Sequence, residues 1–200
     1  MNLNSVVYKL HRRLDTLAED VEAKLVGGYC DGKRRHIEHA IFQLQNSWES
    51  YVRELILLSA TGKYSDNGGV VRSNLPMRIH GKENAAGLLI QLRPGRNRYE
   101  PKWYNAREAA EACRILQLSN TNKINFALGS TPWPLEDLRK IRNFYAHRSK
   151  SSAKQVRDIA WVNSSSDLNV IETVLQAHNS GAKQFDYWAS FMKLASSSML

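Results

Sequence analysis

The sequence predicts an all-α protein, and three observations support this fold class. Apolar residues recur at spacings of three and four over residues 3–25 and again over residues 37–60, as expected for amphipathic helices. A third helical pattern follows Pro132. Proline is favoured at the first position of a helix, so this residue indicates where the helix starts. The 200 residues are enough to bury a core, so we expect one helical domain over residues 1–200.

The first two helices are defined by their apolar positions. Residues 3–25 carry one apolar stripe, and the glycine pair at 27–28 is expected to end this helix. Residues 37–60 form a longer second helix, in which Trp48 and Tyr51 lie at helical spacing. Two such aromatic side chains can stack on bases, but this spacing is more typical of a core. We therefore interpret both as core residues.

Residues 61–102 differ from the helical segments around them, because they are rich in glycine and proline. We interpret them as an insertion made of loops and a short helix at 83–92. The insertion is basic, and its Arg96, Arg98 and Lys102 lie among aromatic residues. This combination suits single-stranded nucleic acid, with cations on phosphates and rings on bases. A solvated loop anchored by its aromatic side chains is the alternative interpretation.

Shorter helices are predicted after the insertion. Asn105 and Glu108 are a capping pair at the start of a helix over 106–118. Residues 119–130 are expected to be a polar linker with a short apolar piece. The helix that follows Pro132 comes next.

The end of the chain is predicted to be helical as well. Ser151-Ser152 are expected to break the preceding helix. C-terminal helices at about 153–196 follow, and we expect them at 153–161, 168–178 and 183–194. The last five residues are expected to be loose.

Residues 142–147, with the sequence RNFYAH, lie near the end of a helix that is predicted to start at Thr131-Pro132. We call them the motif segment. Arg142 falls within the apolar stripe of this helix, where a charge is costly unless it meets a partner or a ligand. His147 is roughly 140° away from Arg142 on an ideal helix. The two can serve one site only if the helix loosens near Ala146 or a second chain completes the site.

The motif segment suits cleavage of a phosphodiester without a metal. Arginine is permanently charged and can hold a phosphate oxygen, and histidine can move a proton near neutral pH. We therefore predict Arg142, His147 and Asn143 as catalytic residues, with Asn143 orienting His147 or donating a hydrogen bond to phosphate. The predicted RNA-binding cations are Arg139, Lys140, Arg148 and Lys150 near the motif segment, and Arg96, Arg98 and Lys102 in the insertion. Alternatively, the cations near the motif segment only complement the helix dipole.

The pattern Arg142-Asn143-x-x-x-His147 resembles the Arg-x4-6-His motif of the HEPN superfamily. Two further stretches agree with this resemblance, Ile37 to Leu58 and Pro101 to Leu116, so that it spans roughly residues 35 to 160 in order. The resemblance implies a HEPN-like helical bundle with a basic insertion. HEPN toxins that are silenced by nucleotide transfer carry a tyrosine two residues after the histidine, where this chain has Ser149.

The resemblance also implies a function. Many HEPN proteins are metal-independent endoribonucleases that act as dimers in toxin–antitoxin, abortive-infection and CRISPR-associated antiviral defence. Others have lost the motif and bind only RNA or protein. A nuclease of this kind must be restrained, so an antitoxin or a defence-system partner protein is expected by analogy.

Charge favours an anionic partner, because the chain has a formal net charge of +9 and a pI near 9.7. Nucleic acid is the commonest such partner, and an anionic membrane surface is the alternative. The sequence has no apolar stretch long enough to span a membrane, and its two cysteines suggest no disulfide framework. Because the first residues have no continuous apolar core and no small-residue cleavage site, we expect no signal peptide. We expect a cytoplasmic protein without a membrane partner.

Neither a metal nor a cofactor is expected. His36 and His39 lie three residues apart, but no neighbouring cysteine or carboxylate cluster completes a metal site. We therefore predict a dimeric, metal-independent endoribonuclease whose RNA, whether tRNA, mRNA or rRNA, the sequence does not identify. A non-catalytic RNA-binding module and an interaction subunit that docks an acidic partner are the alternatives.

Overall fold

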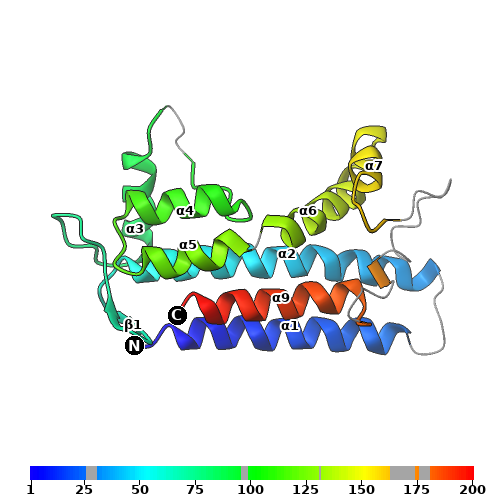
Figure 1. Ribbon diagram of the computed structural model, residues 1–200, viewed down its shortest axis with the longest axis horizontal. Coiled ribbons are helices and arrows are strands. Elements are labelled where there is room, and N and C mark those ends of the chain that lie inside the picture. Colours follow the sequence, from blue (N-terminus) through cyan, green and yellow to red (C-terminus); the bar gives the residue numbers. More distant parts are fainter. Residues whose placement is uncertain (26–30, 96–98, 131, 163–173, 176–180) are drawn as a thin grey trace. The chain divides into compact units, whose positions relative to one another are not determined.

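The computed structural model describes residues 1–25, 31–95, 99–130, 132–162, 174–175 and 181–200 (Figure 1). These residues are mostly helical, and the one sheet among them has two strands. In chain order the elements are α1 (Asn4–Leu25), α2 (Asp31–Ser59), β1 (Tyr64–Asp66), β2 (Gly69–Val71), α3 (Lys82–Leu92), α4 (Ala106–Ile115), α5 (Thr121–Ser130), α6 (Pro132–His147), α7 (Lys150–Arg157) and α9 (Gln184–Ser198). The predicted all-α class is therefore confirmed at the level of its secondary structure.

The chain divides into two compact units, and each is described separately. Unit 1 consists of Met1–His11, Trp48–Pro132 and Lys193–Leu200. Unit 2 consists of Arg12–Ser47 and Trp133–Met192, and it contains the whole motif segment. Three predictions of secondary structure fall outside the described residues: the helix end at 27–28, the helix start at Thr131 and most of the helix at 168–178.

The predicted insertion, in unit 1, contains more regular structure than the sequence indicates. Its short helix is confirmed as α3, but the antiparallel hairpin of β1 and β2 was not predicted. Each strand has only three residues, too few to show an alternating pattern. At the turn, Gly69 has φ +116°, a conformation that favours glycine.

Helix α4 begins as predicted, because the side chain of Asn105 accepts hydrogen bonds from the backbone nitrogens of Arg107 and Glu108. The predicted linker at 119–130 is wrong, since most of it forms α5. Within the short apolar piece of that segment, Ile124, Ala127 and Leu128 are buried, whereas Phe126 is exposed.

The C-terminal end of the chain is packed, so the prediction of a loose tail is wrong. Helix α9 continues to Ser198, and Met199 is fully buried. The hydroxyl of Tyr51 donates to the carbonyl of Ser196 at 3.1 Å. The ammonium of Lys123 donates to the carbonyl oxygen of Leu200 at 2.7 Å. Apolar burial and these hydrogen bonds hold the segment.

In unit 2, α6 and α7 meet at a sharp change of direction after His147 (Figure 1). Arg148 adopts a left-handed conformation, with φ +44°, and Ser149 caps α7. Ser149 and Ser152 form a reciprocal capping box, in which each side chain bonds the backbone nitrogen of the other. The predicted break at Ser151-Ser152 is therefore wrong, because the two serines belong to the first turn of α7.

Candidate functional site

Arg142 is half-buried on α6. Its guanidinium carbon lies 5.1 Å from the centre of the Phe42 ring on α2, which is a cation–π contact. Its Nη1 donates to the side-chain oxygen of Asn143 at 3.2 Å. Its Nε is buried and makes no hydrogen bond with any described residue. The guanidinium is thus positioned by a ring and an amide, neither of which neutralises its charge.

His147 is the last residue of α6 and is exposed. The helix stays regular through Ala146, since the backbone nitrogen of Arg148 still donates to the carbonyl of Phe144 at 2.7 Å. The loosening near Ala146 that would bring Arg142 and His147 together is therefore absent from α6. Five residues of regular helix keep the two side chains roughly 140° apart.

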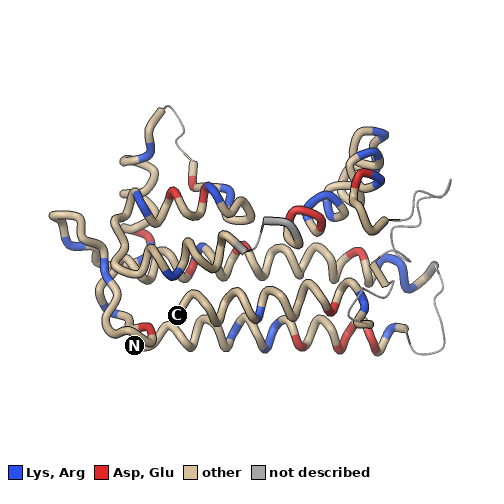
Figure 2. The backbone as a smooth tube through the Cα atoms, in the orientation of Figure 1, with Lys and Arg blue, Asp and Glu red and all other residues tan. Residues whose placement is uncertain are grey.

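Three of the four cations predicted to bind RNA near the motif segment pair with carboxylates. Arg139 Nε donates to Glu136 at 2.9 Å. Lys140 lies 3.5 Å from Asp137, and Arg148 donates to both oxygens of Glu38 at 3.0 and 3.1 Å. The fourth, Lys150, is exposed at the start of α7. Figure 2 shows acidic residues at the start of α6 ahead of its basic residues.

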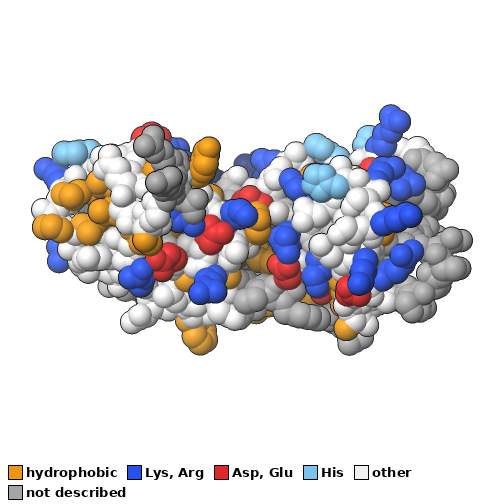
Figure 3. Space-filling view, turned by 90° about the horizontal axis from the view of Figure 1, so that it is seen from above, with side chains coloured by type: hydrophobic (Ala, Val, Ile, Leu, Met, Phe, Trp, Pro, Cys, Tyr) orange, Lys and Arg blue, Asp and Glu red, His pale blue; other side chains and the backbone are white. Residues whose placement is uncertain are grey.

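Lysine, arginine and histidine side chains gather on one face over α6 and α7 (Figure 3). Because several of these cations are already paired, Arg142 differs from its neighbours. Among the described residues it has no carboxylate partner, and its charge remains available to a ligand. A phosphate group, which accepts bidentate hydrogen bonds from a guanidinium, fits this requirement.

The predicted cations of the insertion lie in unit 1. Arg96 and Arg98 are outside the described residues. Lys102 is exposed. The neighbouring Trp103, by contrast, is buried and donates from Nε1 to Glu100 at 3.0 Å, so it is an anchor of the insertion.

Two residues of unit 2 were missed or misjudged from the sequence. Phe42 was not singled out, although it follows the buried Ile41 in the predicted second helix. Asp137 was not singled out as a core residue, but its side chain is buried and accepts from Trp161 Nε1 at 3.0 Å. Burial raises the pKa of Asp137. Residue spacing does not show which ring or indole a side chain meets.

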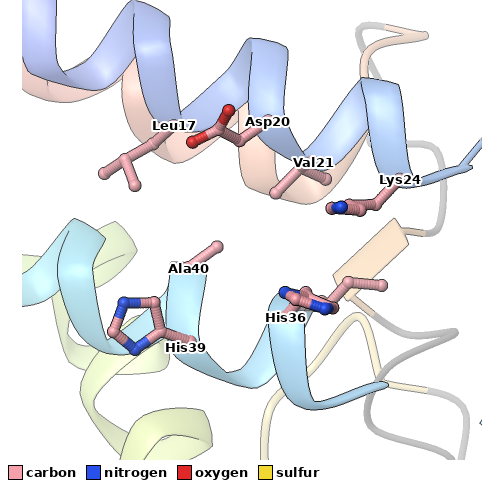
Figure 4. A pocket seen from close by; sticks show the side chains of 8 residues that line it. Leu17, Asp20, Val21, Lys24, His36, His39 and Ala40 are labelled. Carbon is pink, nitrogen blue, oxygen red and sulfur yellow. The ribbon is translucent and has the colours of Figure 1, made fainter. Parts of the chain in front are cut away.

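A cavity of about 200 Å³ lies within unit 2, with side chains of α1 on one wall and of α2 on the other (Figure 4). Its lining is Leu17, Asp20, Val21, Lys24, His36, Ile37, His39 and Ala40. No group of three histidine, cysteine or acidic side chains placed to hold a metal ion occurs in the described parts of the chain. The cavity therefore offers a mixed, partly apolar lining without a set of metal ligands.

Comparisons of the chain with protein-family models, with curated proteins and with solved structures found no match. None of the described helices is long and apolar enough to cross a membrane.

Proposed function

We propose that this protein is a metal-independent endoribonuclease, with Arg142, His147 and Asn143 in the catalytic site. The observation that carries the proposal is the state of Arg142. Its guanidinium is half-buried and fixed by Phe42 and Asn143, and no described carboxylate neutralises it. Such a group can donate hydrogen bonds to a phosphate, whereas its neighbours Arg139 and Arg148 already bind carboxylates.

The proposed reaction uses the 2′-hydroxyl of RNA as the nucleophile. His147 removes the proton of this hydroxyl, and the oxygen of the hydroxyl then attacks phosphorus. The bond from phosphorus to the 5′-oxygen breaks, and the leaving oxygen receives a proton from the imidazolium that forms when His147 takes the proton of the 2′-hydroxyl. The products are a 2′,3′-cyclic phosphate and a 5′-hydroxyl. Arg142 stabilises the negative charge that develops on the phosphoryl oxygens.

The same geometry supports a dimeric site. Because α6 remains regular between Arg142 and His147, the two side chains face different directions within one chain. In a homodimer the exposed His147 of one chain is free to approach the phosphate held by Arg142 of the other. We propose that RNA, of the tRNA, mRNA or rRNA class, is bound in the resulting cleft.

The cellular role that we propose is that of a toxin or an anti-phage defence effector. An unregulated ribonuclease damages the RNA of its own cell, so an antitoxin or a defence-system partner is expected to hold it inactive. This part of the proposal is based on the resemblance of the motif segment to the HEPN motif.

The test is RNA cleavage in EDTA by purified wild-type protein and by variants at the two central residues. We expect His147→Gln to reduce the rate by at least about 100-fold, because it removes the proton-transfer group. Arg142→Lys keeps the charge but loses the planar fork of donors, and it should also be strongly impaired. Substrates with a 2′-deoxyribose at the cleaved position should remain intact.

A matched control is His36→Gln, which changes another exposed histidine of unit 2. This variant should cleave as the wild type does. Cleavage that required a divalent metal, or that His147→Gln left unchanged, would contradict the mechanism. RNA binding without cleavage by the wild type would instead favour the second candidate, a non-catalytic RNA-binding protein. Unit 1 lacks the motif segment but has an excess of positive charge, which supports RNA binding without catalysis.

A further inference from the structure

The connection between α3 and α4, in unit 1, is held at two points. At the first, Arg93 donates from Nη2 to Glu108 at 2.7 Å and from Nη1 to the carbonyl of Tyr99 at 3.3 Å. Glu108 also accepts from the backbone nitrogen of Lys102 at 3.0 Å. A single carboxylate thus joins the end of α3, the first turn of α4 and the segment between them.

The second point is Glu100. Its carboxylate accepts two hydrogen bonds from Arg53 of α2, at 2.6 and 2.7 Å, and one from Trp103 Nε1 at 3.0 Å. Trp103 is buried. Residues 99–103 are therefore tied to the rest of unit 1 by two charged groups and one buried ring.

Tyr99 lies in this anchored segment, yet its side chain is 79% exposed. An aromatic ring that is held near a fixed backbone but left in water is available for stacking. Bases of a single strand stack on such rings whatever their sequence, because every base has a flat π-face.

Cations surround the same segment. Lys102 and Arg107 are exposed, and neither forms an ion pair with a carboxylate in the described part of unit 1. Arg107 directly precedes Glu108 in the first turn of α4, and Glu108 accepts the hydrogen bonds from Arg93 and from the backbone nitrogen of Lys102. Figure 2 shows lysine and arginine residues at the end of α3 and along α4.

We propose that Tyr99, Lys102 and Arg107, which we call the Tyr99 surface, bind single-stranded nucleic acid. Tyr99 stacks on a base, and Lys102 and Arg107 contact phosphates on either side of it. Stacking tolerates any base, so the surface would hold a strand without reading its sequence. The choice of RNA as this strand rests on the proposed ribonuclease function, because a ring and two cations do not distinguish ribose from deoxyribose.

Binding is tested by fluorescence anisotropy with a labelled 12-nucleotide RNA and the DNA of the same sequence. Measurements use the His147→Gln background, so that cleavage does not disturb them. We expect Tyr99→Ala to weaken binding about tenfold without changing the slope of log affinity against log salt concentration. The double variant Lys102→Gln/Arg107→Gln should make that slope shallower by about 1.4, because two phosphate contacts are lost.

The matched controls are Tyr8→Ala and Lys9→Gln, which change an exposed tyrosine and an exposed lysine of α1 in unit 1. Both should bind as the parent protein does. Equal affinity of the Tyr99→Ala variant and its parent would overturn the proposal. So would binding of polyglutamate instead of nucleic acid, which would assign the surface to an acidic protein.

The test of the Tyr99 surface can fail or succeed independently of the test of the proposed ribonuclease. A wild-type protein that binds through the Tyr99 surface but cleaves no RNA supports the surface and refutes the enzyme. A wild-type protein that cleaves RNA, with binding unaffected by Tyr99→Ala, supports the enzyme and refutes the surface.

Discussion

Units 1 and 2 contain the same number of basic residues but differ in their carboxylates. Unit 1 has 14 lysines and arginines against 7 aspartates and glutamates, and unit 2 has 14 against 12. The net charge of the chain therefore comes mostly from unit 1, although the motif segment is in unit 2. A high overall charge is thus weak support for a site in unit 2, where the contacts of Arg142 itself indicate a site.

The two units also use their carboxylates differently. In unit 1, the hydrogen bond from Arg53 lowers the pKa of Glu100. Burial tends to raise the pKa of Glu108, but hydrogen bonds from Lys102 and Arg93 outweigh it and the pKa is lowered. In unit 2, burial raises the pKa values of Asp137 and Asp186. Ionised Glu100 and Glu108 therefore stabilise unit 1, whereas ionised Asp137 and Asp186 are an electrostatic cost to unit 2.

The largest effect expected from this difference is at Glu108. Glu108→Gln removes the charge that pairs with the mostly buried Arg93, which would lose its ion pair. We expect the free energy of unfolding to fall by about 1–2 kcal/mol, measured by urea denaturation at pH 7. Glu111→Gln is the control on the same helix, because its partner Arg114 is exposed to solvent. An equal loss in both variants would show that the Arg93 pair has no special role.

A smaller effect, in the opposite direction, is expected at Asp137. Asp137→Asn keeps an oxygen that can accept the hydrogen bond from Trp161. It removes a carboxyl group whose pKa is raised by burial, and with it the negative charge. At pH 7 the folded protein no longer has to bury a carboxylate, so we expect stability that is unchanged or slightly increased, within about 0.5 kcal/mol. A clear loss in the urea midpoint would mean that the weak contact with Lys140 matters more than burial.

The smallest effect is a difference in the response of the two units to acid. Glu100 and Glu108 have lower pKa values in the folded protein than in the unfolded chain. Their ionised forms therefore stabilise unit 1 above about pH 4, and this stability is lost as the pH falls through the folded-state pKa values. Asp137 and Asp186 have raised values, so their contribution to unit 2 is present below the unfolded pKa and is lost as the pH rises through the folded values.

Hydrogen exchange followed by mass spectrometry measures both responses in one sample. Between pH 7 and about pH 3, after correction for the intrinsic exchange rate, peptides of 99–115 in unit 1 should lose more protection than peptides of 135–145 in unit 2. The reverse order of loss would contradict this use of the carboxylates.

Much of the helical structure could be predicted from the sequence, because long amphipathic helices carry many apolar positions. The first helix, predicted at 3–25, is α1 at Asn4–Leu25. Short elements were predicted less well. The hairpin of β1 and β2 has too few residues for a pattern, and the ten-residue α5 has an apolar residue, Phe126, on its exposed face. The capping box of Ser149 and Ser152 resembles a helix break until the backbone conformation is known.

The candidate site was predictable in its residues but not in its contacts. Position in the apolar stripe indicated that Arg142 is partly buried, and it is. The sequence could not show that Phe42 and Asn143 hold the guanidinium, or that Arg139 and Arg148 are paired with Glu136 and Glu38. These contacts depend on how the helices pack, which residue spacing does not determine.

The central claim, that one active site uses Arg142 and His147 from different chains, is tested most directly by mixing two inactive variants. Arg142→Ala and His147→Ala are purified separately, partly unfolded and refolded together, and assayed for RNA cleavage in EDTA. A mixed dimer contains one site in which both residues are intact. We predict that the mixture regains cleavage while each variant alone stays inactive. A mixture that remains inactive, beside a wild-type protein that survives the same treatment, would contradict the shared site.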